Sequence, residues 1–188
     1  GTSLQALPIH ERARRGLART WQTLRLFPSL SVIDNLMLGQ RAYSADRLTD
    51  VFFRPTDVAH QENEARQRAE HILERTGLIA IKDAPVQDIT YGQQKLVGVA
   101  RALMNEARCL LLDEPMAGVE GQTYALIQNV VRDLAESGLA ICVVEHNVAF
   151  IKDLCDEGVF MFAGKILARG SVDELIADPH LTELYFGT

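Results

Sequence analysis

The sequence predicts an α/β fold in which a parallel sheet is flanked by helices. Two short apolar runs, residues 109–112 and 139–144, are each followed by a segment with helical periodicity. This alternation is typical of βαβ units whose strands are buried on both faces. Hydrophobic residues make up 47% of the 188 residues, a composition that is ordinary for a globular protein. The length fits one domain with a sizeable core, to which a small helical lobe is attached.

The first predicted helix follows a capping signal. Ser31 and Asp34 have capping-box spacing ahead of apolar residues, and the helix is expected to end near Gly39. A second helix is predicted over residues 56–77, with Thr56 or Asp57 as its cap.

This second helix is long and polar, and Gly77 is its predicted stop. Its apolar residues are few: Val58, Ala65, Ala69, Ile72 and Leu73. Because such a thin apolar stripe packs against little, we expect the helix on the surface of a separate lobe.

The next helix begins after "ITYGQ". Its apolar residues recur at i, i+3, i+4 and i+7, which is typical of an amphipathic helix on a core: Leu96, Val99, Ala100 and Leu103. Further helices are predicted over residues 124–138 and 147–156. A hairpin with an Ala163-Gly164 turn and a helix capped by Ser171 and Glu174 complete the chain.

Charge and cysteine content exclude several classes of protein. Acidic residues outnumber basic ones by 25 to 19, a net charge of -6, so nucleic acid is not an expected partner. The cysteines Cys109, Cys142 and Cys155 lie in apolar segments without C-x-x-C spacing. This pattern favours buried reduced thiols over a disulfide or zinc framework. No apolar run reaches the length of a membrane span, so membrane contact is expected only through a partner protein.

Two carboxylates follow the apolar run at residues 109–112. Ligands of parallel sheets bind at the carboxyl ends of the strands, where Asp113 and Glu114 are expected to lie. Asp113 could hold Mg²⁺ directly or through water, and Glu114 could polarise a water as a general base. The alternative is a strand that simply ends in solvated acids.

Two more residues suit phosphate chemistry. His146 follows the run at residues 139–144 and would reach the same sheet edge, although a histidine at a strand end can also be purely structural. Gly92 precedes a helix start, where free N–H groups and the helix dipole favour an anion. The same glycine could instead serve only a tight turn.

Together these segments resemble the ATP-binding-cassette (ABC) ATPases. The family's signature loop reads leucine, serine, glycine, glycine, glutamine. It matches Ile89, Thr90, Tyr91, Gly92 and Gln93, with Tyr91 in place of a glycine. The resemblance implies a partial ABC ATPase domain over residues 1–188. A helical subdomain at about residues 40–105 carries the signature loop, and the remainder is a partial P-loop NTPase (RecA-like) α/β core. The resemblance also implies the use of ATP and Mg²⁺.

The resemblance also assigns roles to single residues. "CLLLDEP" is similar to the Walker B strand, which implies Asp113 as a metal ligand and Glu114 as the catalytic base. His146 corresponds to the catalytic switch histidine. Gln22 corresponds to the Q-loop glutamine, which contacts the metal and links the site to the transporter. Glu120 stands where the family commonly has aspartate in its D-loop, so contacts of that loop across a dimer are less secure.

Within the family, residues 7–40 and 177–188 resemble ATPase subunits of branched-chain amino-acid importers, and "YGQQ" is typical of one subunit type. The partners implied are a second ABC ATPase subunit and transmembrane permease subunits. The chain would then be cytoplasmic and peripheral on the inner face of the cell membrane. DNA-repair ATPases with similar signature loops are disfavoured, because neither heptads nor C-x-x-C pairs are present.

One family motif has no counterpart. The 188 residues contain no G-x-x-x-x-G-K-[ST] loop, whose amides and lysine cradle phosphates. In the family each nucleotide lies between that loop of one subunit and the signature loop of the other. We therefore expect a cassette without its N-terminal part, with weak or undetectable ATP binding and no activity when alone. We also expect an exposed sheet edge that drives self-association. The alternative function is a non-catalytic interaction module that docks on a permease or partner ATPase.

Overall fold

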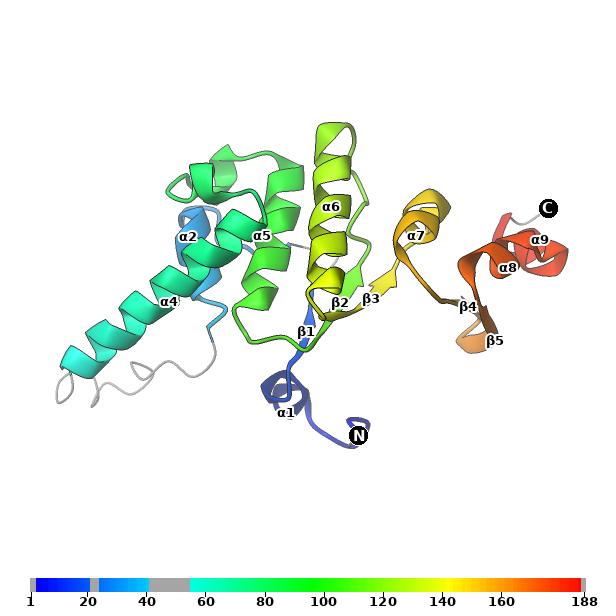
Figure 1. Ribbon diagram of the computed structural model, residues 1–188, viewed down its shortest axis with the longest axis horizontal. Coiled ribbons are helices and arrows are strands. Elements are labelled where there is room, and N and C mark those ends of the chain that lie inside the picture. Colours follow the sequence, from blue (N-terminus) through cyan, green and yellow to red (C-terminus); the bar gives the residue numbers. More distant parts are fainter. Residues whose placement is uncertain (1–2, 21–23, 41–54, 187–188) are drawn as a thin grey trace. The chain divides into compact units, whose positions relative to one another are not determined.

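The structure is a computed structural model that describes residues 3–20, 24–40 and 55–186. Its contacts divide the chain into two units, Gly1–Val144 and Glu145–Thr188. Figure 1 shows helices on a short sheet in the first unit, and a hairpin with small helices in the second. In the described part of the chain, no helix is long and apolar enough to cross a membrane.

A parallel sheet forms the centre of the first unit, as predicted. Its strands are β1 (Leu17–Arg19), β2 (Cys109–Asp113) and β3 (Ala140–Val144), in the order β1-β2-β3. β2 pairs with both neighbours, and all these pairings are parallel. Leu110 and Leu112 of β2 are fully buried, so the central strand anchors the core.

β3 differs from the prediction of a strand buried on both faces. Ala140, Cys142 and Val144 are exposed, and Val144 retains 61% of its accessible surface. The reason is position, since β3 is an outer strand of the sheet that the structure describes. The expectation of a buried thiol is therefore wrong for Cys142, whereas Cys109 and Cys155 are partly buried and all three thiols are free.

Helices α5 (Tyr91–Leu103) and α6 (Gln122–Glu136) pack in the first unit beside the sheet (Figure 1). α5 buries Leu96, Val99 and Ala100, as its periodicity predicts. α6 buries an apolar stripe that comprises Ile127, Val130, Val131 and Leu134. The two helices approach closely at Gly92, where a Cβ atom would lie 2.3 Å from Cγ2 of Thr123. Only glycine fits there without a shift of the Thr123 side chain or of α6.

The described residues of the first unit also form four short elements and one long helix. The short ones are α1 (Ile9–Arg14), α2 (Val32–Met37) and two 3₁₀ helices, Ile79–Ile81 and Val86–Asp88. Ser31 caps α2 by accepting the N–H of Asp34 at 3.1 Å, as predicted.

α4 (Pro55–Arg75) is the long helix, and it buries Ala65, Ala69, Ile72 and Leu73, four of its five predicted apolar contacts. The predicted caps Thr56 and Asp57 are wrong, because α4 already begins at Pro55; proline suits the first helical turn. Residues 41–54 lie outside the described residues, and the helical subdomain at about residues 40–105 stays a prediction.

The second unit contains α7 (Val148–Leu154), the antiparallel pair β4 (Gly158–Phe162) and β5 (Lys165–Gly170), α8 (Val172–Ala177) and α9 (Pro179–Phe186). Ala163 and Gly164 have φ values of 48° and 77°, as expected for a tight hairpin turn. Ser171 and Glu174 form the predicted capping box of α8.

Candidate functional site

Asp113 is the last residue of β2, at the carboxyl end of the parallel sheet. Its Oδ2 lies 2.8 Å from Nη2 of Arg19, the last residue of β1. The main-chain N–H of Asp113 donates to Oγ1 of Thr20 at 3.3 Å. The side chain keeps 25% of its accessible surface. The Asp113 carboxylate is thus partly open to solvent and paired with the Arg19 guanidinium. A metal ion could replace the guanidinium at this carboxylate.

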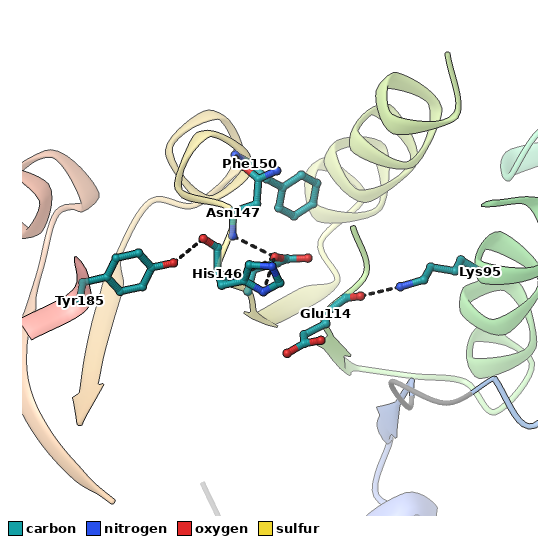
Figure 2. Close-up of polar contacts among 7 residues, drawn as sticks. Lys95, Glu114, His146, Asn147, Phe150 and Tyr185 are labelled. Carbon is teal, nitrogen blue, oxygen red and sulfur yellow. Dashed lines mark hydrogen bonds and ion pairs between the residues drawn. The ribbon is translucent and has the colours of Figure 1, made fainter. Parts of the chain in front are cut away.

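Glu114 follows Asp113 in an unusual backbone conformation, with a φ of 47°. Its N–H donates to the carbonyl of Val144 at 2.8 Å, and its carbonyl accepts the N–H of Ala117 at 3.3 Å. Nζ of Lys95 also donates to this carbonyl at 2.7 Å. In Figure 2 the ammonium approaches the Glu114 main chain, and the Glu114 carboxylate projects away from Lys95. The left-handed backbone of Glu114 therefore directs its carboxylate away from Lys95.

The predicted signature residues surround the start of α5. Thr90 is the N-cap: its Oγ1 accepts the N–H of Gln93 at 3.3 Å. The side chain of Gln93 in turn accepts the N–H of Thr90 at 2.9 Å. Tyr91 and Gly92 form the first turn, whose N–H groups have no acceptor within the helix. Ile89 immediately precedes the cap. The geometry is that of a helix N-terminus able to meet an anion, and Tyr91 beside it is 47% exposed.

The sequence interpretation missed the contacts of Lys95 with Glu114 and of Arg19 with Asp113. Lys95 is only 6% exposed and stands on the apolar face of α5, four residues before Val99. A charged residue at a predicted core position was the available signal. Arg19 had no comparable signal, because its pairing with Asp113 depends on the parallel contact between β1 and β2.

His146 belongs to the second unit, directly after β3. Its imidazole is exposed, and its carbonyl accepts the hydroxyl of Tyr185 (Figure 2). The carboxylate of Glu145 accepts the main-chain N–H groups of His146 and Asn147 at 2.9 and 3.0 Å. The expected meeting of His146 with Glu114 stays a prediction, and Gln22 lies outside the described residues.

A single carboxylate with neighbouring phosphates suits Mg²⁺, which usually keeps several waters and takes few protein ligands. Asp113 provides such an oxygen, and the hydroxyl of Thr20 lies next to it. Among the described residues, no group of three or more His, Cys, Asp or Glu could hold a metal by itself. The donor set therefore fits a magnesium ion that arrives with phosphate.

A cavity of about 470 Å³ lies within the first unit, among α1, β1 and α5. Its walls include apolar side chains and four arginines: Arg12, Arg19, Arg25 and Arg101. Burial lowers the pKa of Arg101 from its ordinary value, and this guanidinium donates to the carbonyl of Arg25 at 2.6 Å. The cavity offers an apolar, positively charged surface next to Thr20 and Leu24.

Comparison with known proteins identifies relatives of this arrangement. The family model described as "ABC transporter" matches residues 1–117. The branched-chain amino acid transport ATP-binding protein BraF of Pseudomonas aeruginosa is 29% identical over 188 residues, which cover 100% of this chain and 74% of that protein. The lipopolysaccharide export ATP-binding protein LptB of Acidithiobacillus ferridurans is 32% identical over 98% of this chain and 70% of its own length.

A solved structure shows the same fold. It is a nucleotide-free ATP-binding cassette from an ABC transporter, with a TM-score of 0.78 and 28% identity. The match covers 95% of this chain and 71% of that one. One relative is named for amino-acid transport and another for lipopolysaccharide export, so the comparisons do not single out the branched-chain type.

Proposed function

Because the chain belongs to the ABC transporter ATPase family, we propose that it is the ATP-binding subunit of an importer for branched-chain amino acids. In this role it couples ATP binding and hydrolysis to transport. One observation carries the proposal: the capped start of α5 and the two acids at the carboxyl end of β2 lie in the same unit, joined by the contact of Lys95 with Glu114. These are two of the motifs that the family uses to bind and hydrolyse nucleotide.

The roles of the residues follow from their chemistry. Asp113 would bind Mg²⁺ through a carboxylate oxygen, and Glu114 would orient a water and accept its proton. His146 would contact the terminal phosphate, and Gln22 would contact the metal. Mg²⁺ itself would neutralise the charge on the phosphates.

Ile89, Thr90, Tyr91, Gly92 and Gln93 would meet the phosphates of a second nucleotide. The amides of the first turn of α5 suit that contact, because they lack acceptors within the helix. Each chain thus contributes to two half-sites, which implies a second ABC ATPase subunit as partner.

The 188 residues provide no G-x-x-x-x-G-K-[ST] loop. Positioning and charge stabilisation supply nearly all the catalysis of phosphoryl transfer. For these 188 residues alone we therefore expect weak or undetectable binding of Mg-ATP. Calorimetric titration measures this directly, and micromolar affinity with turnover would contradict it.

Docking to a permease is the partner proposal, and the cavity lined by the four arginines supports it. An apolar wall with guanidinium groups suits a permease segment that carries apolar and acidic side chains. The subunit would then be peripheral on the cytoplasmic face of the membrane. If the chain binds the permease but never supports hydrolysis, the alternative of a non-catalytic docking module is favoured.

Substrate assignment rests on the similarity to BraF over the whole chain and on "YGQQ" at residues 91–94. The test is uptake of labelled leucine in cells that lack the chain. We expect lower uptake, restored by the intact gene and not by its E114Q variant. Normal uptake together with retained lipopolysaccharide would instead favour export.

A further inference from the structure

Lys95 is a buried cation that contacts two motifs at once. It is 6% exposed, and an ammonium ion removed from water needs acceptors around it. Nζ donates to the carbonyl of Glu114 at 2.7 Å, and it lies 5.5 Å from the centroid of the Tyr91 ring. The second distance is within the range of a cation–π interaction. One side chain thus connects the first turn of α5 with the turn after β2.

The Glu114 end of this connection is strained. A non-glycine residue with a φ near 47° occupies the left-handed region, which persists only where neighbours hold it. Lys95 is one of those neighbours, together with the carbonyl of Val144 and the N–H of Ala117. Loss of the ammonium would remove one of the hydrogen bonds that hold the Glu114 backbone in this conformation, and this conformation sets the direction of the carboxylate.

Two further contacts place Lys95 and Tyr91 next to the end of β2 and the loop that follows it. Lys95 and Asp113 both line a cavity of about 20 Å³, enough for roughly one water molecule. A Cβ atom at Gly118 would lie 3.2 Å from Cε1 of Tyr91, so the loop after Glu114 passes directly beside the tyrosine ring. A change at Tyr91 therefore reaches the Glu114 turn through the ammonium and through this loop.

We infer that Lys95 is a positioning residue that couples the loop at the start of α5 to the direction of the Glu114 carboxylate. A ligand that moves Tyr91 changes the position of the ammonium, and with it the hydrogen bond that supports the Glu114 turn. Interpreting this as communication between two nucleotide half-sites rests on the proposed function, because that function places Tyr91 and Glu114 in different half-sites.

The first test needs no nucleotide. Amide hydrogen exchange by NMR is compared among the wild-type chain, K95R and K95M, with K152M as a control at a lysine that is 59% exposed. We expect exchange at the Glu114 and Ala117 amides to rise about tenfold in K95M, and less than about threefold in K95R and K152M. Exchange in α4 serves as the reference for global stability. Equal exchange at Glu114 in K95M and wild type would overturn the inference.

Coupling is tested by a double-mutant cycle with Y91L. Y91L alone should speed exchange at Glu114, whereas in the K95M background it should add less than about twofold, because only the contact of the Tyr91 ring with the loop at Gly118 then remains. A purely structural lysine predicts additive effects, and additivity would overturn the coupling.

A wild-type measurement covers the case in which K95M does not fold. The ammonium of Lys95 should give a ¹⁵N–¹H signal that exchanges slowly with water and disappears in K95R. An ammonium that exchanges as fast as that of Lys152 would contradict the buried contact.

The last arm uses the transporter purified with its partner subunits. There K95M should lower kcat about tenfold and change KM for Mg-ATP less than about twofold, because the carboxylate acts on the chemical step and not on binding. K95R should restore most of the rate. If wild-type transporter hydrolyses no ATP, the proposed function fails while the exchange results still decide the coupling. If hydrolysis is normal in K95M, the positioning role fails and the proposed function stands.

Discussion

Arg19 and Asp113 face each other at the ends of two adjacent parallel strands, with Nη2 2.8 Å from Oδ2. The guanidinium binds one of the two carboxylate oxygens that could hold a metal ion. Both side chains are partly exposed, so the pair adds at most about 1 kcal/mol to stability. Its larger effect should be on cation binding, because a bound guanidinium and a metal ion compete for the same oxygen.

Replacing Arg19 with glutamine should therefore raise the affinity of the chain for a divalent cation. We expect Mn²⁺, used as a paramagnetic substitute for Mg²⁺, to bind R19Q about three- to tenfold more tightly, since one competing charge is removed. Relaxation enhancement of signals near Asp113 measures this binding. R14Q is the control, because Arg14 pairs with Glu11 at 3.2 Å in α1. Equal Mn²⁺ affinity in wild type and R19Q would show that Arg19 does not compete.

Gly92 should tolerate no side chain. A Cβ atom there would lie 2.3 Å from Cγ2 of Thr123, so G92A must displace the Thr123 side chain or α6, at a cost of about 1–3 kcal/mol. G98A is the matched control in the same helix, because its Cβ would meet Leu24 at an ordinary 3.5 Å. The control should be neutral or slightly stabilising, since alanine favours helix more than glycine.

Urea unfolding of the G92A and G98A variants measures both effects. T123S removes the obstructing methyl group and should restore most of the stability of G92A. If G92A is as stable as G98A, the close approach of the two helices is wrong, and with it the steric reason for glycine in the predicted signature loop.

Local patterns predicted most of the helices because capping boxes and apolar spacing act within a few residues. Ser31, Thr90 and Ser171 all accept the N–H three residues later, at the N-termini of α2, α5 and α8. Two of these caps were predicted from spacing alone. The cap of α4 was predicted incorrectly at Thr56 or Asp57, because proline at the first helical position gave an equally valid start.

Contacts between distant residues could not be predicted in the same way. β1 has only three residues, too few for a periodic pattern, and its pairing with β2 joins segments about ninety residues apart. Burial of β3 depended on which strands flank it, and that is a property of the sheet and not of the run at residues 139–144. Glu114 was identified by residue type, but its positive φ and its contact with Lys95 arise from three separate segments.

The backbone of Glu114 gives a third prediction. At a φ of 47° a side chain costs about 1 kcal/mol relative to glycine. E114G should therefore be about 1 kcal/mol more stable than E114A, although neither has the carboxylate. The comparison separates strain from the loss of charge, because both variants remove the same group.

Glu120 provides the control for this comparison, since its φ is not positive. There E120G should be less stable than E120A by about 0.4–1 kcal/mol, because glycine increases the conformational entropy of the unfolded chain. Urea unfolding of the four variants tests the difference. If E114G is less stable than E114A by the same amount, the turn is not strained and needs no support from Lys95.

The outer edge of β3 gives the last prediction. In the sheet that the structure describes, β3 pairs only with β2, and Val144 is 61% exposed. An apolar strand with an open edge readily pairs with another strand. The 188-residue chain should therefore self-associate at tens of micromolar, and V144K should shift it toward monomer because a lysine on an edge strand opposes such pairing.

L126K is the matched control for this change, since Leu126 is an exposed apolar residue of α6 that is 37% accessible. It removes a similar apolar surface and adds the same charge, but leaves the strand edge intact. Sedimentation velocity should find L126K associated like the wild type and V144K mostly monomeric. If both lysine variants dissociate equally, general charge repulsion and not strand pairing drives the association. A wild-type chain that stays monomeric at these concentrations would show that the edge of β3 does not pair with another chain, because there would be no self-association for Val144 to drive.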